Sequence, residues 1–257
     1  MTDASADVPG GELRLLARIP SASNAAFLGA IGETRVIYKP SAGERPLWDF
    51  PDGDLAQRER AAYLVSEALG WRIVPPTVVR DGPLGEGMVQ LWRDPAEVPR
   101  AVELVAPIAA AGTGRRRVFD VIGDPDFPVA IAHEDSPALR RIAVFDVIVN
   151  NADRKGGHIL EMADGHRHGV DHGLTFHIDD KLRTVLWGWA GDELADAELD
   201  GVSRVRAALS AELGTALAEL LSPYELEMLD LRCELLLAEA RFPAPTGSWH
   251  VVPWPLI

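Results

Sequence analysis

The chain has 257 residues, enough for one large domain or two closely joined lobes with a buried core. Its formal net charge of −14 argues against nucleic acid as a partner, because phosphate groups would be repelled. The single cysteine, Cys233, excludes an internal disulfide and fits a reducing compartment, and no apolar run approaches the roughly 20 residues that a membrane span needs. We therefore expect a cytoplasmic protein without stable membrane insertion.

The first third of the sequence predicts a small sheet and one helix. Asp54 opens the helix as a capping residue, Gln57 suits a capping box, and Gly70 ends the helical pattern. Short apolar runs bounded by Gly, Pro and Asp predict strands on either side of this helix. The expected strands cover 13–20, 35–40, 75–79 and 87–92, the last two forming a hairpin that turns at Asp81 and Gly82.

After Trp92 the pattern becomes helical. The Pro- and Ala-rich segment 95–117 predicts a connection, and Ser136-Pro137 opens a helix to about Val149 that is apolar nearly all round and therefore central. Two short strands, 158–162 and 168–170, and helices over 203–241 follow, the last with a Ser222/Glu225 capping box. We expect an N-lobe at 1–92 and a C-lobe at 93–257.

Two charged residues of the first lobe are candidates for a binding site. Lys39 lies late in an apolar strand, so its ammonium must reach an anion or extend to water. Glu59, on the following helix, could pair with Lys39 and hold it extended. Spacing alone favours a simpler interpretation, in which Lys39 lies on an edge strand and Glu59 on a solvated helix face.

Two acidic residues of the second lobe form a stronger candidate. Asp153 lies in the polar segment 150–158, which directly follows the apolar helix, and polar groups there are costly unless paired or used. The alternative is a polar turn in which Asp153 only caps. Asp171 ends a short strand two residues before Gly173, a common arrangement for a metal ligand. The intervening hairpin brings both carboxylates to one end, where metal-bound phosphate could lie.

These four segments, in this order, resemble the phosphatidylinositol 3-/4-kinase-related branch of the protein-kinase fold, which includes the HipA-like bacterial kinases. The motif Tyr38-Lys39-Pro40 with segment 43–51 is similar to an actinobacterial group within this branch. The resemblance covers about 13–241. It implies an α+β, two-lobed protein-kinase-like fold with a small β-rich N-lobe and a mainly helical C-lobe. It also implies ATP-dependent transfer of a phosphoryl group, with Mg²⁺ or Mn²⁺, to a hydroxyl of a protein Ser/Thr, a lipid or a small molecule.

The resemblance also implies a role for each matching residue. Lys39 matches the lysine that contacts the nucleotide phosphates, and Asp153 the acid that orients or deprotonates the acceptor hydroxyl. Asp171 matches the metal-binding acid, and His158 stands where the family has a metal-binding Asn. The residues implied for nucleotide binding are Lys39, its partner Glu59, Gln90, Leu91 and Trp92 at the adenine, and Ser23 and Asn24 in place of a glycine-rich loop.

His158 leaves two alternatives open. Imidazole suits transition metals better than magnesium, so we expect His158 to point at Asp171 and to favour Mn²⁺. The first alternative is a pseudokinase, a nucleotide-binding or interaction module without phosphoryl transfer. A weaker one is a metal-dependent hydrolase built on the Asp/His cluster. The acidic charge argues against docking on an anionic membrane, and so against a phosphoinositide acceptor.

Overall fold

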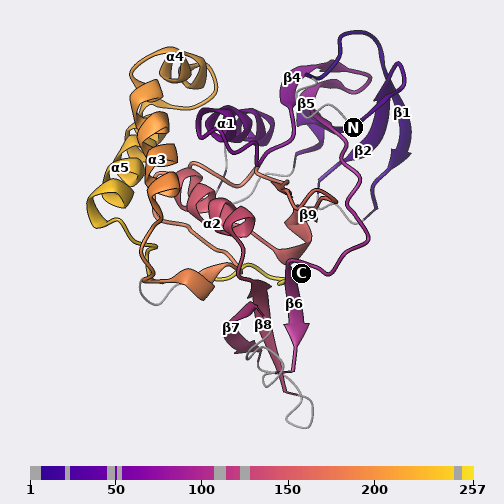
Figure 1. Cartoon of the computed structure of the whole chain (residues 1–257). Helices are drawn as coiled ribbons and strands as arrows, with labels where there is room; N and C mark the ends of the chain where they lie inside the picture. Colours follow the sequence, from indigo (N-terminus) through magenta and orange to yellow (C-terminus); the bar gives the residue numbers. More distant parts are fainter. Residues whose placement is uncertain are drawn as a thin grey trace.

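The computed structural model describes residues 7–20, 24–44, 50, 54–106, 114–121, 128–245 and 251–257. An N-terminal sheet lies beside a larger helical part, and a three-stranded sheet projects from the far end of the latter (Figure 1). The α+β, two-lobed architecture expected from the sequence, with a small β-rich N-lobe and a mainly helical C-lobe, is observed. None of the helices in the described part of the chain combines the length and apolar character needed to cross a bilayer.

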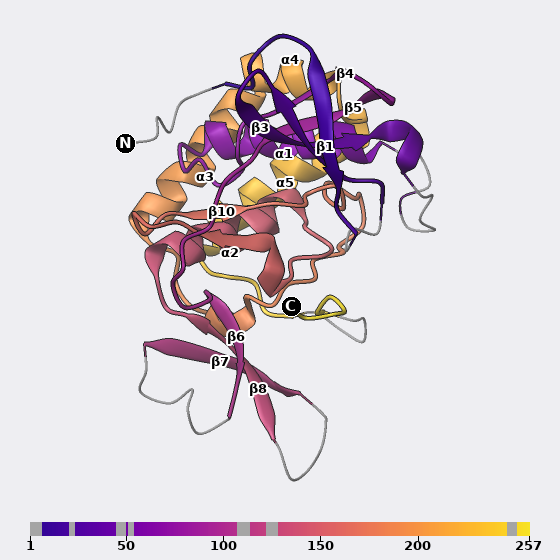
Figure 2. The ribbon, with the colours of Figure 1, turned by 90° about the vertical axis from the view of Figure 1, so that its right-hand side faces the viewer.

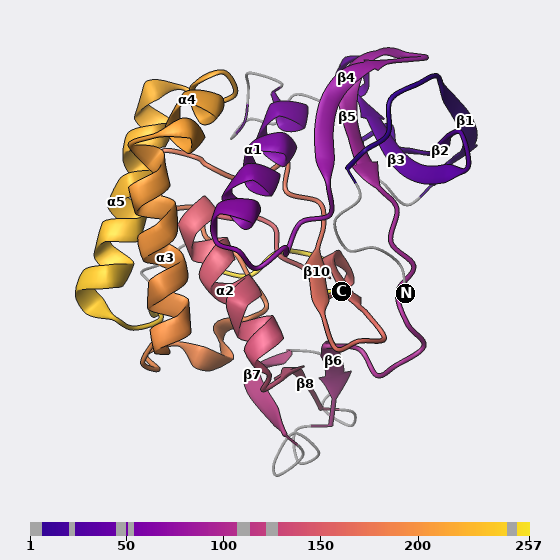
Figure 3. The same ribbon diagram turned by 45° about the horizontal axis from the view of Figure 1, so that its top comes forward.

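The N-terminal sheet is antiparallel throughout, with the strand order β1-β2-β3-β5-β4. One face carries an apolar cluster around Val36, Tyr38 and Val89, all fully buried. Helix α1 enters between β3 and β4 and lies beside this sheet (Figure 3). The elements are β1 (Leu13–Arg18), β2 (Phe27–Ile31), β3 (Thr34–Pro40), α1 (Leu55–Ala68), β4 (Thr77–Gly82) and β5 (Gly85–Leu91).

Helix α1 begins where the sequence predicts, but a different residue caps it. Asp54 makes no capping hydrogen bond, because its carboxylate accepts instead from Arg58 Nε at 2.8 Å. The Glu44 carboxylate takes its place and accepts from the amides of Leu55 (3.1 Å) and Ala56 (3.0 Å). A cap from a residue ten positions upstream depends on the path of the loop, so local spacing does not predict it.

The helical part is built around α2, whose inward side chains are almost completely buried. Ser136 caps α2 through Leu139 N, and Ser222 and Glu225 form the predicted capping box of α5. A short two-stranded ribbon, β9 with β10, follows α2 and leads to Asp171. The elements are α2 (Pro137–Val149), β9 (Ile159–Glu161), β10 (Arg167–Gly169), α3 (Asp196–Leu209), α4 (Glu212–Ala218) and α5 (Pro223–Glu239).

A three-stranded antiparallel sheet occupies the region where the sequence predicts only a connection. Strands β6 (Val102–Val105), β7 (Arg115–Val121) and β8 (Val129–Glu134) pair in the order β6-β8-β7 and project from the helical part (Figure 2). The sequence conceals them because β6 has four residues and β7 begins with three arginines. Strand β2 is also missed, since Gly29 within it is a turn signal.

Candidate functional site

Lys39 lies at the centre of a cleft between the two lobes. Its Nζ lies 2.7 Å from Glu59 Oε1 and 2.7 Å from Asp171 Oδ1, so it joins β3, α1 and the segment after β10. Burial alone would lower the pKa of Lys39, but the two carboxylates outweigh it and raise this pKa above its usual value. The cleft is lined by Asn24, Ala25, Ala26, Lys39, Pro40, Glu44, Leu55, Ala56, Glu59, Met88, Asp153, Asp171, Gly173 and Leu174.

Glu59 fixes two parts of the cleft at once. Its side chain is buried, and its second oxygen accepts a hydrogen bond from the His172 backbone amide at 2.9 Å. The solvated helix position that spacing favours for Glu59 is therefore wrong. Because one carboxylate holds both Lys39 and the residue after Asp171, it sets the distance between the two charges of the cleft.

Asp171 presents its carboxylate into the cleft from a left-handed backbone conformation, with φ +63°. Its side chain is 51% exposed, so the oxygens remain accessible to a ligand. Lys39 lowers the pKa of Asp171 well below its ordinary value, and burial opposes this only in part. Asp171 is therefore ionised at neutral pH.

His158 points toward Asp171, with Nε2 at 3.4 Å from Asp171 Oδ2. Burial lowers the pKa of His158 to about 4; Asp171 opposes this shift, and the nearby cations Arg154, Lys155 and Lys39 add to it. Its Nδ1 is buried and has no hydrogen-bond partner among the described residues. The ring is thus neutral at pH 7, the state in which imidazole can ligate a metal.

Asp153 lies on the same cleft and is held in place from both sides. Its amide donates to Asn151 Oδ1 at 2.9 Å, and its carboxylate accepts from Lys155 Nζ at 2.8 Å. Burial raises the pKa of Asp153, although Lys155 opposes this. The sequence contains three lysines, Lys39, Lys155 and Lys181, and two of them contact the cleft carboxylates.

Arg154 organises the site from beneath, a role that the sequence does not reveal. Its side chain is fully buried and paired with buried Asp146, with Nη2 at 2.8 Å and Nε at 2.9 Å from the two carboxylate oxygens. Arg154 Nη1 also donates to the carbonyls of His158 and Val170, both at 3.2 Å. Nη2 lies 2.6 Å from His172 Nε2. One guanidinium thus links the Asp153 loop to the segment after β10 that carries Asp171.

The three residues expected to contact the adenine do not share one environment. Gln90 pairs with Ile37 across the strands, so it shares a sheet face with Lys39, and its amide donates to Thr77 Oγ1 at 2.8 Å. Leu91 points into the apolar cluster on the other face, and Trp92 Nε1 donates to Asp94 at 2.7 Å. None of the three lines the cavity at Lys39, and strand alternation is the reason for Leu91.

The remaining expectations concern Ser23 and Asn24 at the nucleotide and the ligands of the metal. Asn24 lines the cleft, whereas Ser23 lies outside the described residues. Within the described residues, no three His, Cys, Asp or Glu side chains come close enough together to hold a metal ion. Asp153, His158 and Asp171 are therefore not assembled into a three-ligand metal site, and the two carboxylates contact Lys155 and Lys39 instead.

Comparison with known proteins identifies a relative that matches nearly the whole chain. No family model matches the sequence. The chain is 48% identical over 269 residues to Protein Rv2133c of Mycobacterium tuberculosis, covering 98% of this chain and 95% of that protein. The chain belongs to the family of Rv2133c. Among solved structures, the Helicobacter pylori proinflammatory kinase CtkA matches with a TM-score of 0.43 and 11% identity, over 89% of this chain and 94% of that one.

The charged residues around Lys39 are of the kinds that bind a nucleotide with a divalent cation, but the cavity between them is too small to hold a nucleotide. The cavity at Lys39 is about 90 Å³, below the roughly 300–1,000 Å³ of ligand pockets. A nucleotide therefore needs a wider opening between the lobes. A magnesium-type cation is usually held by one or two carboxylates together with substrate phosphates, so two protein ligands suffice. Asp171 supplies one such carboxylate, and His158 beside it adds an imidazole, which suits transition metals better than magnesium.

Proposed function

We propose that the chain is an ATP-dependent phosphotransferase related to the phosphatidylinositol 3-/4-kinases and HipA-like kinases. One observation carries the proposal: a strand lysine is held between a helix carboxylate and a half-exposed carboxylate of the opposite lobe. A phosphoryl group in transit needs positioned cations more than covalent help. Lys39 supplies one such cation, already oriented by Glu59.

Each cleft residue then has a chemical task. Lys39 leaves Asp171 and binds the phosphates, while Glu59 keeps its ammonium extended. Asp171 and the neutral ring of His158 hold the metal, Mg²⁺ or Mn²⁺, which neutralises charge on the phosphates when bound. Asp153 accepts or orients the proton of the acceptor hydroxyl. Lys155, which now pairs with Asp153, is placed to exchange that carboxylate for a phosphate oxygen.

The acceptor in this proposal is a hydroxyl group, and the net charge of the chain bears on which class of molecule carries it. A net charge of −14 opposes docking on an anionic membrane. We therefore favour a protein Ser/Thr or a small-molecule hydroxyl over a phosphoinositide headgroup.

A second candidate is nucleotide binding without phosphoryl transfer. The observation that favours it is His158, whose ring lies 3.4 Å from Asp171 where the resembled family has a carboxamide, because imidazole is a poor ligand for magnesium. Turnover of ATP with Mg²⁺ or Mn²⁺ separates the two candidates, because both predict binding and only the first predicts hydrolysis or transfer.

The small number of lysines allows a sharp test of nucleotide binding. Fluorosulfonylbenzoyl adenosine carries an electrophile at the end that corresponds to the phosphates of ATP. We expect it to modify Lys39 or Lys155, and ATP to protect them, while Lys181 outside the cleft serves as the internal control. Peptide mass spectrometry gives the site. Modification of Lys181 at an equal rate, or no protection by ATP, would contradict the proposal.

A further inference from the structure

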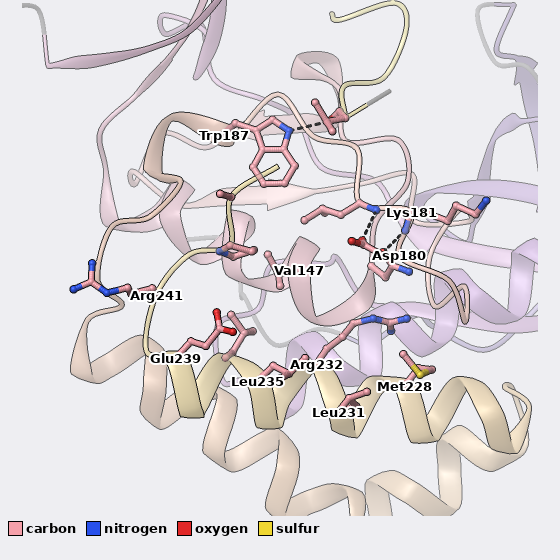
Figure 4. A pocket seen from close by; sticks show the side chains of 16 residues that line it. Val147, Asp180, Lys181, Trp187, Met228, Leu231, Arg232, Leu235, Glu239 and Arg241 are labelled. Carbon is pink, nitrogen blue, oxygen red and sulfur yellow. Dashed lines mark hydrogen bonds between the residues drawn. The ribbon is translucent and has the colours of Figure 1, made fainter. Parts of the chain in front are cut away.

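A larger hollow lies in the helical part, away from Lys39. Its volume is about 450 Å³, within the roughly 300–1,000 Å³ of small-molecule pockets. It lies between α5, the C-terminal end of α2 and the chain around 180–187, and Figure 4 shows its lining side chains. It shares no lining residue with the cleft at Lys39. It is therefore a separate candidate site.

Most of the lining is apolar. Leu231 and Leu235 of α5 face this hollow and remain 40% and 49% exposed. Val147 of α2 and the indole of Trp187 lie opposite, and the Trp187 Nε1 donates to the Val251 carbonyl at 2.8 Å. With its only donor engaged, Trp187 offers the hollow an apolar ring. An occupant needs an apolar body to use these surfaces.

Arg232 is one of the polar residues of the lining, and its hydrogen bonding is incomplete. Its Nη2 donates to the His177 carbonyl, whereas Nη1 is buried without a hydrogen-bond partner in the described part of the chain. Burial lowers the pKa of Arg232 to about 10, with Asp180 opposing the shift. The guanidinium remains charged at neutral pH. A buried charged donor without a partner is costly, so a negatively charged acceptor would relieve it.

We propose that this hollow binds a small amphiphilic monoanion. Its carboxylate or sulfonate pairs with Arg232, and its apolar body lies against Leu231, Leu235 and Trp187. Two acidic residues, Asp180 and Glu239, and two further cations, Lys181 and Arg241, also line the hollow. With Arg232 the lining has three cationic and two acidic side chains, an excess of one positive charge that suits a monoanion. The site does not depend on nucleotide binding and is tested without ATP.

The test uses 8-anilinonaphthalene-1-sulfonate, an aromatic monoanion that fluoresces in apolar surroundings. We expect saturable binding at one site, displaced by decanoate but not by 1-decanol, which lacks the charge. Arg232→Gln should weaken binding by about tenfold or more, as expected for a lost charge-assisted hydrogen bond. The fold should survive, because Asn150 Nδ2 also donates to the His177 carbonyl, at 2.9 Å. Arg206→Gln, an arginine paired outside the hollow, is the matched control and should leave affinity unchanged.

Several results would overturn the proposal. They are the absence of saturable binding, unchanged affinity in Arg232→Gln, and equal displacement by decanoate and decanol. Should Arg232→Gln lose helicity by circular dichroism, Leu235→Trp decides instead. That variant adds bulk at a half-exposed position of the hollow and should block the probe without unfolding the chain. Unaltered binding in Leu235→Trp would also contradict the assignment.

Discussion

Replacing Arg154 by Met should destabilise the protein far more than replacing an exposed arginine. Arg154 and Asp146 are both 0% exposed, so the change leaves a buried carboxylate whose one remaining side-chain donor among the described residues is Asn151 Nδ2, at 2.9 Å. Breaking a buried ion pair from one side costs about 3–5 kcal/mol. For a chain of this size that corresponds to a melting temperature lowered by roughly 6–20 °C. Urea unfolding and thermal melts followed by circular dichroism measure both quantities.

A second substitution separates the ion pair from the rest of the arginine's contacts. Asp146→Asn keeps the acceptor for Asn151 but removes the charge, so the double variant with Arg154→Met should be more stable than Arg154→Met alone. Arg206→Met, which breaks exposed pairs with Asp230 and Glu234, should cost less than about 1 kcal/mol. If Arg154→Met cost no more than Arg206→Met, or if the double variant were less stable than Arg154→Met, the structural role of this pair would be refuted.

Three further predictions concern Glu59 in the cleft, the cap of α1 and three buried histidines. Glu59→Gln should keep the fold, since an amide oxygen can still accept from His172 N, but should abolish ATP-protected labelling of Lys39; protection at the wild-type level contradicts it. Glu44→Ala should lower the unfolding free energy by about 1 kcal/mol through loss of the α1 cap, measured by urea unfolding, and an unchanged midpoint argues against that cap. Burial lowers the pKa values of His133, His158 and His168 to about 4. The unfolded chain therefore binds more protons than the folded one between about pH 6.5 and 4, and the free energy of unfolding should decrease as the pH falls through that window. Urea midpoints that stay constant from pH 7 to 4.5 would exclude this.

The elements that sequence predicts well are those with local signals. Ser136-Pro137 and Ser222 with Glu225 mark helix starts within four residues, and both are confirmed. Lys39 and Asp171, which the family resemblance places at the nucleotide phosphates and the metal, also lie together, with Nζ 2.7 Å from Oδ1. Their chemical roles stay predictions.

The contacts that the sequence could not predict join residues far apart in the chain. The second carboxylate oxygen of Glu59 accepts a hydrogen bond from the backbone amide of His172, 113 positions later in the sequence. No rule of local sequence spacing predicts a contact over so many residues. In the sequence, Arg154 is one of several charged residues in a polar loop. Its burial follows from its ion pair with Asp146, which lies in the last turns of α2. The pKa of His158 is also not predictable from the sequence. An isolated imidazole has a pKa near 6.5, whereas the pKa of His158 is about 4, because burial and three nearby cations disfavour its charged form.

Lysine and arginine occupy different positions in this protein, and this difference leads to a final prediction. The chain has three lysines, and two of them hold the acidic side chains of the cleft, whereas the buried scaffold ion uses arginine. A guanidinium fits fixed, several-point contacts such as those of Arg154, while a compact ammonium can exchange a carboxylate for a phosphate oxygen. Lys39→Arg keeps the charge, yet its planar fork is too large for the two 2.7 Å contacts with Glu59 and Asp171. We therefore expect Lys39→Arg to fold with a melting temperature near that of wild type and to lose at least about tenfold in ATP affinity by calorimetry, the equivalent of one charge-assisted hydrogen bond. Wild-type affinity in Lys39→Arg would show that only the charge at this position matters.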